Sequence, residues 1–239
     1  MDIWDNEYVC DPHAGGNAGP DIKYMEFDRR LHIAAPFKFP SDYRHFFGMD
    51  WGMAENHPAV GLWVAVSPTG MVYVYDELTI TGVSAQRFAT DVLRQSVNKI
   101  EAFVLSEDCF AQESDQKTIA SKMMQFGLRP AVKAKRENKA FSGADTVKHY
   151  LKPVQGNPKV QIFPNCFRLI DNLETLKWSD KLNDDPADAL RHLLVFLSTL
   201  NWTPKQEEKH IFKPVEINLL DRFKERDSIS INPETGYIT

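Results

Sequence analysis

Short apolar runs alternate with turn-forming residues in the first half of the chain's core region. The runs "FFGMD" (46–50), "AVGLWVAV" (59–66) and "MVYVYDEL" (71–78) are rich in aromatic and β-branched residues, a composition typical of strands. The "SPTG" between the last two runs is a good hairpin turn. We therefore expect three antiparallel strands.

Helical and extended patterns alternate in the second half. Ser84 is a suitable N-cap for a helix to about residue 100, with Phe88, Val92 and Val97 on its inner face. The run "AFVL" (102–105) predicts a fourth strand and "LRPAVKAK" (128–135) a fifth. Further helices are expected over 115–126, closing at Gly127, over 139–151, over 166–178 and over 185–200, with the short apolar run "VQIF" (160–163) between the second and third of these.

This order predicts an α/β fold in which a mixed five-stranded sheet, with its first three strands antiparallel, is flanked by helices. Residues 1–40 mix Gly, Pro and charge, and we expect a lead-in without a core of its own. The domain should span 41–202. Residues 203–239 alternate charge and Pro with small apolar clusters, which indicates a poorly ordered or peripherally docked extension.

The composition restricts the cellular compartment of the protein more than it restricts the function. Three cysteines, Cys10, Cys109 and Cys166, lie far apart without a CxxC pair, which argues against a disulfide framework and a cysteine zinc site and favours a reducing cytoplasm. No apolar run approaches the roughly 18 residues of a membrane span, and the acidic N-terminus is unlike a signal peptide. We expect a protein that neither spans a membrane nor is exported.

Four aspartates stand at the ends of the predicted elements. Asp50 ends the first strand, Asp108 follows the fourth, and Asp185 and Asp188 share one face of the first turn of the last helix. If the first and fourth strands are neighbours, these acids lie together. Gathered carboxylates repel one another, and divalent metal ions relieve that repulsion. Oxygen ligands favour Mg²⁺ or Mn²⁺ over Zn²⁺, and two such ions can stabilise both the attacking and the leaving oxygen of a phosphodiester displacement.

Each acid also has an ordinary structural explanation. An aspartate at a strand end, such as Asp50, is often a cap or turn residue, and Asp184 and Asp185 can be charges favoured by the macrodipole at a helix N-terminus. Asp188 is harder to explain in this way, because apolar residues follow it along the helix. The combination of acids, in this order, favours the metal site.

The chain resembles a known family over roughly residues 25 to 200. The segments "FGMDWG", "HPAVGLWVAV", "VYVYDEL" and "DDPADALRH" are similar to the first acidic motif, the second and third strands and the last acidic motif of the nuclease domain of the large terminase subunit of tailed bacteriophages. That domain has a ribonuclease H-like, resolvase-type fold. The resemblance implies a metal-dependent endodeoxyribonuclease that cuts concatemeric viral double-stranded DNA during genome packaging, in the cytoplasm of the infected bacterial host.

The resemblance also implies roles for the acids. Asp50 corresponds to the first metal-binding acid, Asp108 to the second and Asp188 to the third, and Asp185 lies where the family often has an assisting His or Asp. Glu107, next to Asp108, departs from the pattern, and alternation along "AFVLSED" does not decide which of the two points inward. The implied cofactors are two ions of Mg²⁺ or Mn²⁺.

Partners follow from the same resemblance. A complete large terminase also has an ATPase domain, and it works with the portal protein and the small terminase subunit. No GxxxxGK[ST] motif occurs in this chain. We therefore expect the nuclease half alone, as a fragment or as a separately encoded protein.

Two other hypotheses about the function remain open. Resolvases carry a similar DxxDA motif, so a Holliday-junction resolvase is possible, and so is a nuclease-dead module that binds DNA or the portal. Other enzyme classes fit poorly: there is no HExxH and no GxSxG.

We expect His192 at the surface or as a wedge, and Trp51, Trp63 and Trp178 in the core.

A net charge of −5 gives no global sign of a DNA-binding protein, but the charge is uneven. The stretch 129–152 carries seven basic and two acidic residues, a net charge of +5. An exposed charged face is the ordinary explanation of such a run. Because the run follows the fifth strand, beside the acids, we expect it to contact DNA through Lys133, Lys135, Arg136 and Lys139.

Overall fold

The computed structural model describes residues 21–112, 116–135, 137, 142–180, 184–200 and 202. All of them belong to one compact unit, Met1–Lys205. The predictions made for residues 1–20, Arg136, Lys139 and the whole C-terminal extension, 203–239, lie outside the described residues.

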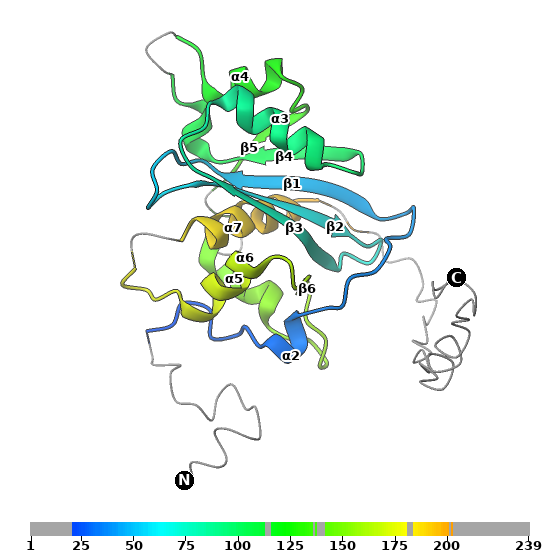
Figure 1. Cartoon of the computed structure of the whole chain (residues 1–239). Helices are drawn as coiled ribbons and strands as arrows, with labels where there is room; N and C mark the ends of the chain where they lie inside the picture. Colours follow the sequence, from blue (N-terminus) through cyan, green and yellow to red (C-terminus); the bar gives the residue numbers. More distant parts are fainter. Residues whose placement is uncertain are drawn as a thin grey trace, which may run out of the picture. The chain divides into compact units, whose positions relative to one another are not determined.

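One mixed sheet organises the unit (Figure 1). Its strands are β1 (Arg44–Asp50), β2 (Ala59–Val66), β3 (Val72–Ile80), β4 (Ile100–Leu105), β5 (Ala131–Lys133) and β6 (Val160–Ile162), in the spatial order β5-β4-β1-β2-β3-β6. The first three strands are antiparallel, as predicted, and β4 lies parallel to β1. The expected five strands become six, because the run 160–162 pairs in parallel with β3. The predicted fold class is otherwise confirmed.

The predicted helices are present in the expected order with shorter bounds: α3 (Ala85–Gln95), α4 (Ile119–Gln125), α5 (Gly143–Leu151), α6 (Phe167–Thr175) and α7 (Asp185–Leu197). The short helix α2 (Arg29–His32) and the 3₁₀ helix η1 (Glu107–Phe110) were not predicted. Ser84 caps α3 as expected. The predicted inward place of Val97 is wrong: α3 ends at Gln95, Ser96 turns extended to accept from Trp63 Nε1, and Val97 is 84% exposed.

Helices cover both faces of the sheet (Figure 1). On one face, α3 and α4 pack over the core that contains Phe47, Met49 and Trp63. On the other, α5, α6 and α7 pack over the strand residues of the second core. Trp51 and Trp63 are buried as predicted, but the prediction for Trp178 is wrong, because it follows α6 in an exposed turn.

Gly48 in β1 allows α7 to approach the sheet closely. A Cβ atom at Gly48 would lie 2.2 Å from Cγ of Leu193 in α7, so a larger residue would push the helix away. Side chains alternate along a strand. Phe46 contacts Phe196 of α7 and Phe47 contacts α3, so Asp50 emerges on the α7 side of the sheet.

The described part of the lead-in packs against this α7 side. Ile22 forms an antiparallel bridge with Lys177, and Ile33 forms a parallel bridge with Ile162. Tyr24 between them is buried in the same core as α6 and α7. Across the described ranges, no helix combines the length and the apolar character that a membrane crossing requires.

Candidate metal centre

Asp50 ends β1 in a nearly closed environment. Its side chain is 13% exposed, and its Oδ1 lies 3.3 Å from Nε2 of His192 on α7. The next residue, Trp51, donates its backbone N–H to Oγ of Ser106 (3.1 Å), which joins the ends of β1 and β4. These strand ends were expected to lie together only on the condition that the two strands are neighbours, and the register shows that they are neighbours and parallel.

Asp185, in the first turn of α7, lies close to Asp50. Its side chain is 2% exposed and contacts Nδ1 of His57. Burial raises the pKa of Asp185, the charge and hydrogen bond of His57 oppose that shift, and the charge of Asp50 adds to it. The buried carboxylate therefore lacks full compensation from the protein.

His57 reaches the site from the loop between β1 and β2. Gly52 makes the tight loop possible, because a Cβ atom there would lie 2.0 Å from the backbone oxygen of His57. The N–H of His57 donates to the oxygen of Ala54 (3.1 Å) and holds the turn. One donor atom each of Asp50, His57 and Asp185 lies within 4.8 Å of the others, a spacing that suits one metal ion.

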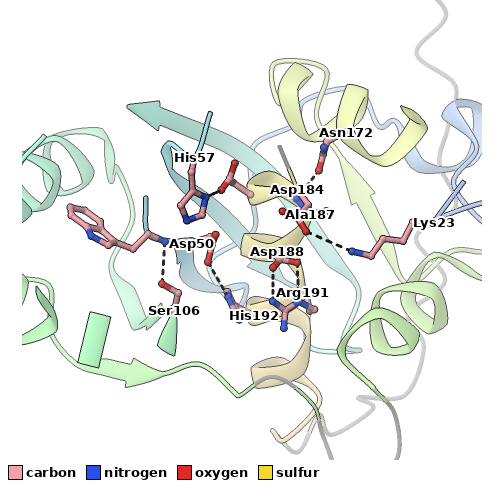
Figure 2. A network of polar contacts seen from close by, with 12 residues as sticks. Lys23, Asp50, His57, Ser106, Asn172, Asp184, Ala187, Asp188, Arg191 and His192 are labelled. Atoms are coloured by element: carbon pink, nitrogen blue, oxygen red, sulfur yellow. Dashed lines mark hydrogen bonds and ion pairs between the residues drawn. The ribbon is translucent and has the colours of Figure 1, made fainter. Parts of the chain in front are cut away.

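Asp188 lies one turn further along α7 and is paired within the helix. Both of its oxygens accept hydrogen bonds from Arg191, at 3.0 and 2.7 Å (Figure 2). Burial lowers the pKa of Arg191, but the hydrogen bonds and charge of Asp188 outweigh burial, and the net shift is upward. Burial, with the charge of Asp188, also raises the pKa of Tyr24. Asp188 is therefore paired with an arginine, whereas Asp185 contacts a histidine.

Asp184 precedes α7 and faces the lead-in. Its Oδ2 lies 4.0 Å from Nζ of Lys23, as Figure 2 shows. Burial and the charge of Asp188 raise the pKa of Asp184, while Lys23 lowers it. Three acids thus gather at the N-terminal end of one helix, Asp184 as its N-cap residue and Asp185 and Asp188 in its first turn.

Asp108 lies at the same end of the sheet but outside the group formed by Asp50, His57 and Asp185. It sits in η1, directly after β4, and its side chain is exposed. The pKa of the Cys109 thiol is raised to about 12, mainly by burial and in addition by the charges of Asp50 and Asp108. Both carboxylates therefore act on this same thiol. Glu107 instead pairs with Nζ of Lys133 at 2.9 Å.

Helices α6 and α7 receive N-terminal caps from other elements. Their own N-cap residues, Cys166 and Asp184, make no side-chain cap hydrogen bond. Glu77 of β3 accepts from the backbone N–H groups of Arg168 and Leu169 at the start of α6, and Asn172 of α6 accepts from the N–H of Ala187 (3.1 Å) in α7. Capping contacts therefore lead from the sheet through α6 to the helix that carries Asp185.

A cleft of about 910 Å³ adjoins the centre. Asp185 and Pro186 line it together with Glu55, Arg168, Lys177 and Ser179. The centre is thus reached from solvent along the side formed by α6 and the loop after it.

No protein-family model matches the sequence, and no curated protein matches it either. Solved structures do match. The large terminase of a thermophilic bacteriophage superposes with a TM-score of 0.59 at 16% identity, over 75% of this chain and 45% of that one. The nuclease domain of the large terminase from bacteriophage P22 superposes with a TM-score of 0.59 at 16% identity, over 75% of this chain and 94% of that domain.

The chain has the fold of a large-terminase nuclease domain. It spans less than half of the large terminase from the thermophilic bacteriophage. Within that ribonuclease H-like fold, the centre lies at the carboxyl end of β1, where β1 and β4 run side by side.

Sequence reasoning missed two histidines of this centre. His192 was expected at the surface or as a wedge, yet it is 4% exposed and contacts Asp50. Its spacing of seven residues from Asp185 places both on one helix face, and that spacing was a usable signal. His57 had no periodic signal, because only the folded loop brings it to Asp185.

Proposed function

We propose that this protein is a metal-dependent endodeoxyribonuclease that cuts double-stranded viral DNA during genome packaging. One observation carries the proposal: Asp50, His57 and Asp185 converge within 4.8 Å at the carboxyl end of β1, in the fold of a terminase nuclease domain. The ATPase domain, the portal protein and the small terminase subunit are proposed partners on the strength of the resemblance alone.

The donor set fits a divalent cation. Two carboxylates and one imidazole offer hard oxygen ligands and one nitrogen ligand, and the buried Asp185 carboxylate gains from a nearby positive charge. Mg²⁺ or Mn²⁺ would be held by Asp50, His57 and Asp185, with Asp108 and Asp188 supporting a second ion. Because imidazole is a poorer ligand for Mg²⁺ than for transition metals, Mn²⁺ should serve better. The ions would neutralise charge on the attacked phosphodiester and activate water.

The protein's own groups position this donor set. His192 contacts one oxygen of Asp50, His57 contacts Asp185, and Arg191 holds both oxygens of Asp188. Partners of this kind fix the orientation of ligating side chains. The cleft beside Asp185 gives a DNA strand access to the centre.

Plasmid nicking tests the proposal. We expect cleavage with Mn²⁺, weaker cleavage with Mg²⁺ and none in EDTA. Asp50→Asn and Asp185→Asn should each lower the rate by at least about a hundredfold, because they remove charged ligands of the catalytic ion. The control is Asp91→Asn, which changes a buried acid paired with Arg87 and Arg94 on α3, away from the centre.

Two results would contradict the proposal: undiminished cleavage in EDTA, or normal cleavage by a folded Asp50→Asn variant. Comparing cleavage by Asp108→Asn and by Glu107→Gln shows which acid after β4 has the proposed catalytic role. If the glutamate variant alone loses activity, Glu107 has the role proposed for Asp108.

A further inference from the structure

An exposed tryptophan stands between two lysines at the rim of the cleft. Trp178 is 52% exposed. Nζ of Lys148, on α5, lies 4.7 Å from the centroid of its ring, and Nζ of Lys23 lies 5.9 Å from it. A large aromatic ring in solvent, flanked by cations, does not contribute to the core that the sequence predicted for it.

The backbone of Trp178 is fixed although its side chain is exposed. Its N–H donates to the oxygen of Asp21 (2.9 Å), and the N–H of Lys23 donates to the oxygen of Leu176 (2.8 Å). These two bonds flank the bridge between Ile22 and Lys177. The indole is therefore presented next to an isolated β-bridge that fixes the backbone, so a ligand would not have to order the loop.

Nearby acids are engaged within the loop. Asp21 accepts a hydrogen bond from Oγ of Ser179 (2.9 Å), and Asp180 accepts one from the backbone N–H of Lys177 (2.8 Å). Two ammonium groups, those of Lys23 and Lys148, lie against the indole ring. The chemistry offered at Trp178 is thus cationic and aromatic, which matches phosphates and a base.

The tryptophan is also connected to the metal centre. Lys177 and Ser179, its neighbours in sequence, line the cleft that Asp185 lines. Lys23 reaches from the indole to Asp184, 4.0 Å from its Oδ2. A strand that leaves the centre along the cleft would meet Trp178.

We propose that Trp178 and Lys148 form a binding site for a single DNA strand, in which the indole stacks on a base and Lys148 pairs with a phosphate. This site rests on the proposed nuclease function and extends it, because it assigns the path of the strand beside the centre. Lys148 lies over the ring in the free protein and would turn to a phosphate when a base stacks on the ring, while Lys23 keeps its contact with Asp184.

Binding of a fluorescein-labelled single-stranded oligonucleotide, measured by anisotropy in EDTA, tests the site without interference from cleavage. Trp178→Ala should weaken binding at least about fivefold and leave the salt dependence unchanged, because stacking involves no counterion release. Trp178→Phe should restore most of the affinity. Lys148→Ala should weaken binding and reduce the salt slope by about 0.7, the value for one contact with a single strand.

Two exposed positions serve as matched controls. Phe126 follows α4 on the other face of the sheet, and Lys99 precedes β4 at the end of the sheet away from Asp50. Phe126→Ala and Lys99→Ala should bind like the unaltered protein. Lys23 is left unaltered, because its replacement would remove the contact with Asp184 and so disturb the centre as well.

The outcomes separate this site from the nuclease function. If the unaltered protein binds and cleaves DNA while Trp178→Ala and Lys148→Ala bind equally well, the strand site is wrong and the nuclease function stands. If Trp178→Ala loses affinity and Trp178→Phe does not regain it, stacking is wrong. If the unaltered protein neither binds nor cleaves DNA, both proposals fail.

Discussion

Asp185 carries a buried negative charge close to Asp50. Burial raises the pKa of Asp185, and the charge of Asp50 raises it further. Because the folded pKa is raised, folding favours the neutral carboxyl group. The stabilising contribution of that group is complete below the unfolded pKa of about 4 and is lost as the pH rises through the folded pKa. At neutral pH, the metal-free protein therefore carries an electrostatic cost at this residue.

Asp185→Asn should remove that cost. In EDTA at pH 7, the variant should melt at a higher temperature than the unaltered protein, and the difference should shrink towards pH 4, where the aspartate is also neutral. Added Mn²⁺ should raise the melting temperature of the unaltered protein, because binding stabilises the folded state, and should raise that of the variant less. Thermal melts from pH 4 to 8, with and without Mn²⁺, measure both effects.

The exposed Asp171 on α6 is the matched control, and Asp171→Asn should show neither effect. A lower melting temperature for Asp185→Asn at pH 7 in EDTA would mean that its contact with His57 outweighs the cost of its charge.

At the scale of elements, the position of α7 depends on contacts made by other elements. Gly48 sets how closely α7 approaches β1, and Asn172 of α6 caps the N-terminus that carries Asp185. Local propensity therefore forms the helix, while its neighbours decide where its acids stand.

Asn172→Ala should reduce stability by about 1 kcal/mol, the usual effect of losing a cap. It should also weaken Mn²⁺ binding several-fold, because the first turn of α7 holds Asp185. Thr118→Ala is the matched control, since it removes the cap of α4, where Thr118 accepts from the N–H of Ser121 (3.0 Å) on the other face. The control should lose similar stability but keep its Mn²⁺ affinity. Denaturant unfolding and Mn²⁺ titration distinguish the two, and an equal loss of Mn²⁺ affinity in both variants would contradict the argument.

The sequence predicts elements better than it predicts the contacts between them. The strand expected over 59–66 has those bounds in the structure, because its apolar residues leave little alternative. Alternation along β4 could not decide between Glu107 and Asp108, because the chain turns into η1 directly after Ser106. His57 could not be predicted, since its place depends on the close passage of the loop at Gly52.

At the scale of the whole domain, β1, β4 and β5 are parallel, so their carboxyl ends share one edge of the sheet. Asp50 ends the first of these strands, and Lys133 ends the third and pairs with Glu107. The basic stretch 129–152 therefore passes the edge of the sheet that bears the metal centre. Lys135 is exposed two residues further on. Under the proposed nuclease function, Lys133 and Lys135 would meet DNA at the edge where the acids gather.

Lys133, Lys135 and Arg136 changed together to Ala should weaken duplex binding and reduce its salt slope by roughly two to three, because each lost phosphate contact removes about 0.9 from the slope. Fold stability should change little, since exposed charges contribute little to it. The matched control removes two exposed lysines elsewhere, Lys38 and Lys99, and should leave the slope unchanged. Binding of a labelled duplex at several salt concentrations in EDTA provides both slopes. An equal fall in slope for both variants would indicate a diffuse effect of net charge, and an unchanged slope in the triple variant would place the duplex away from β5.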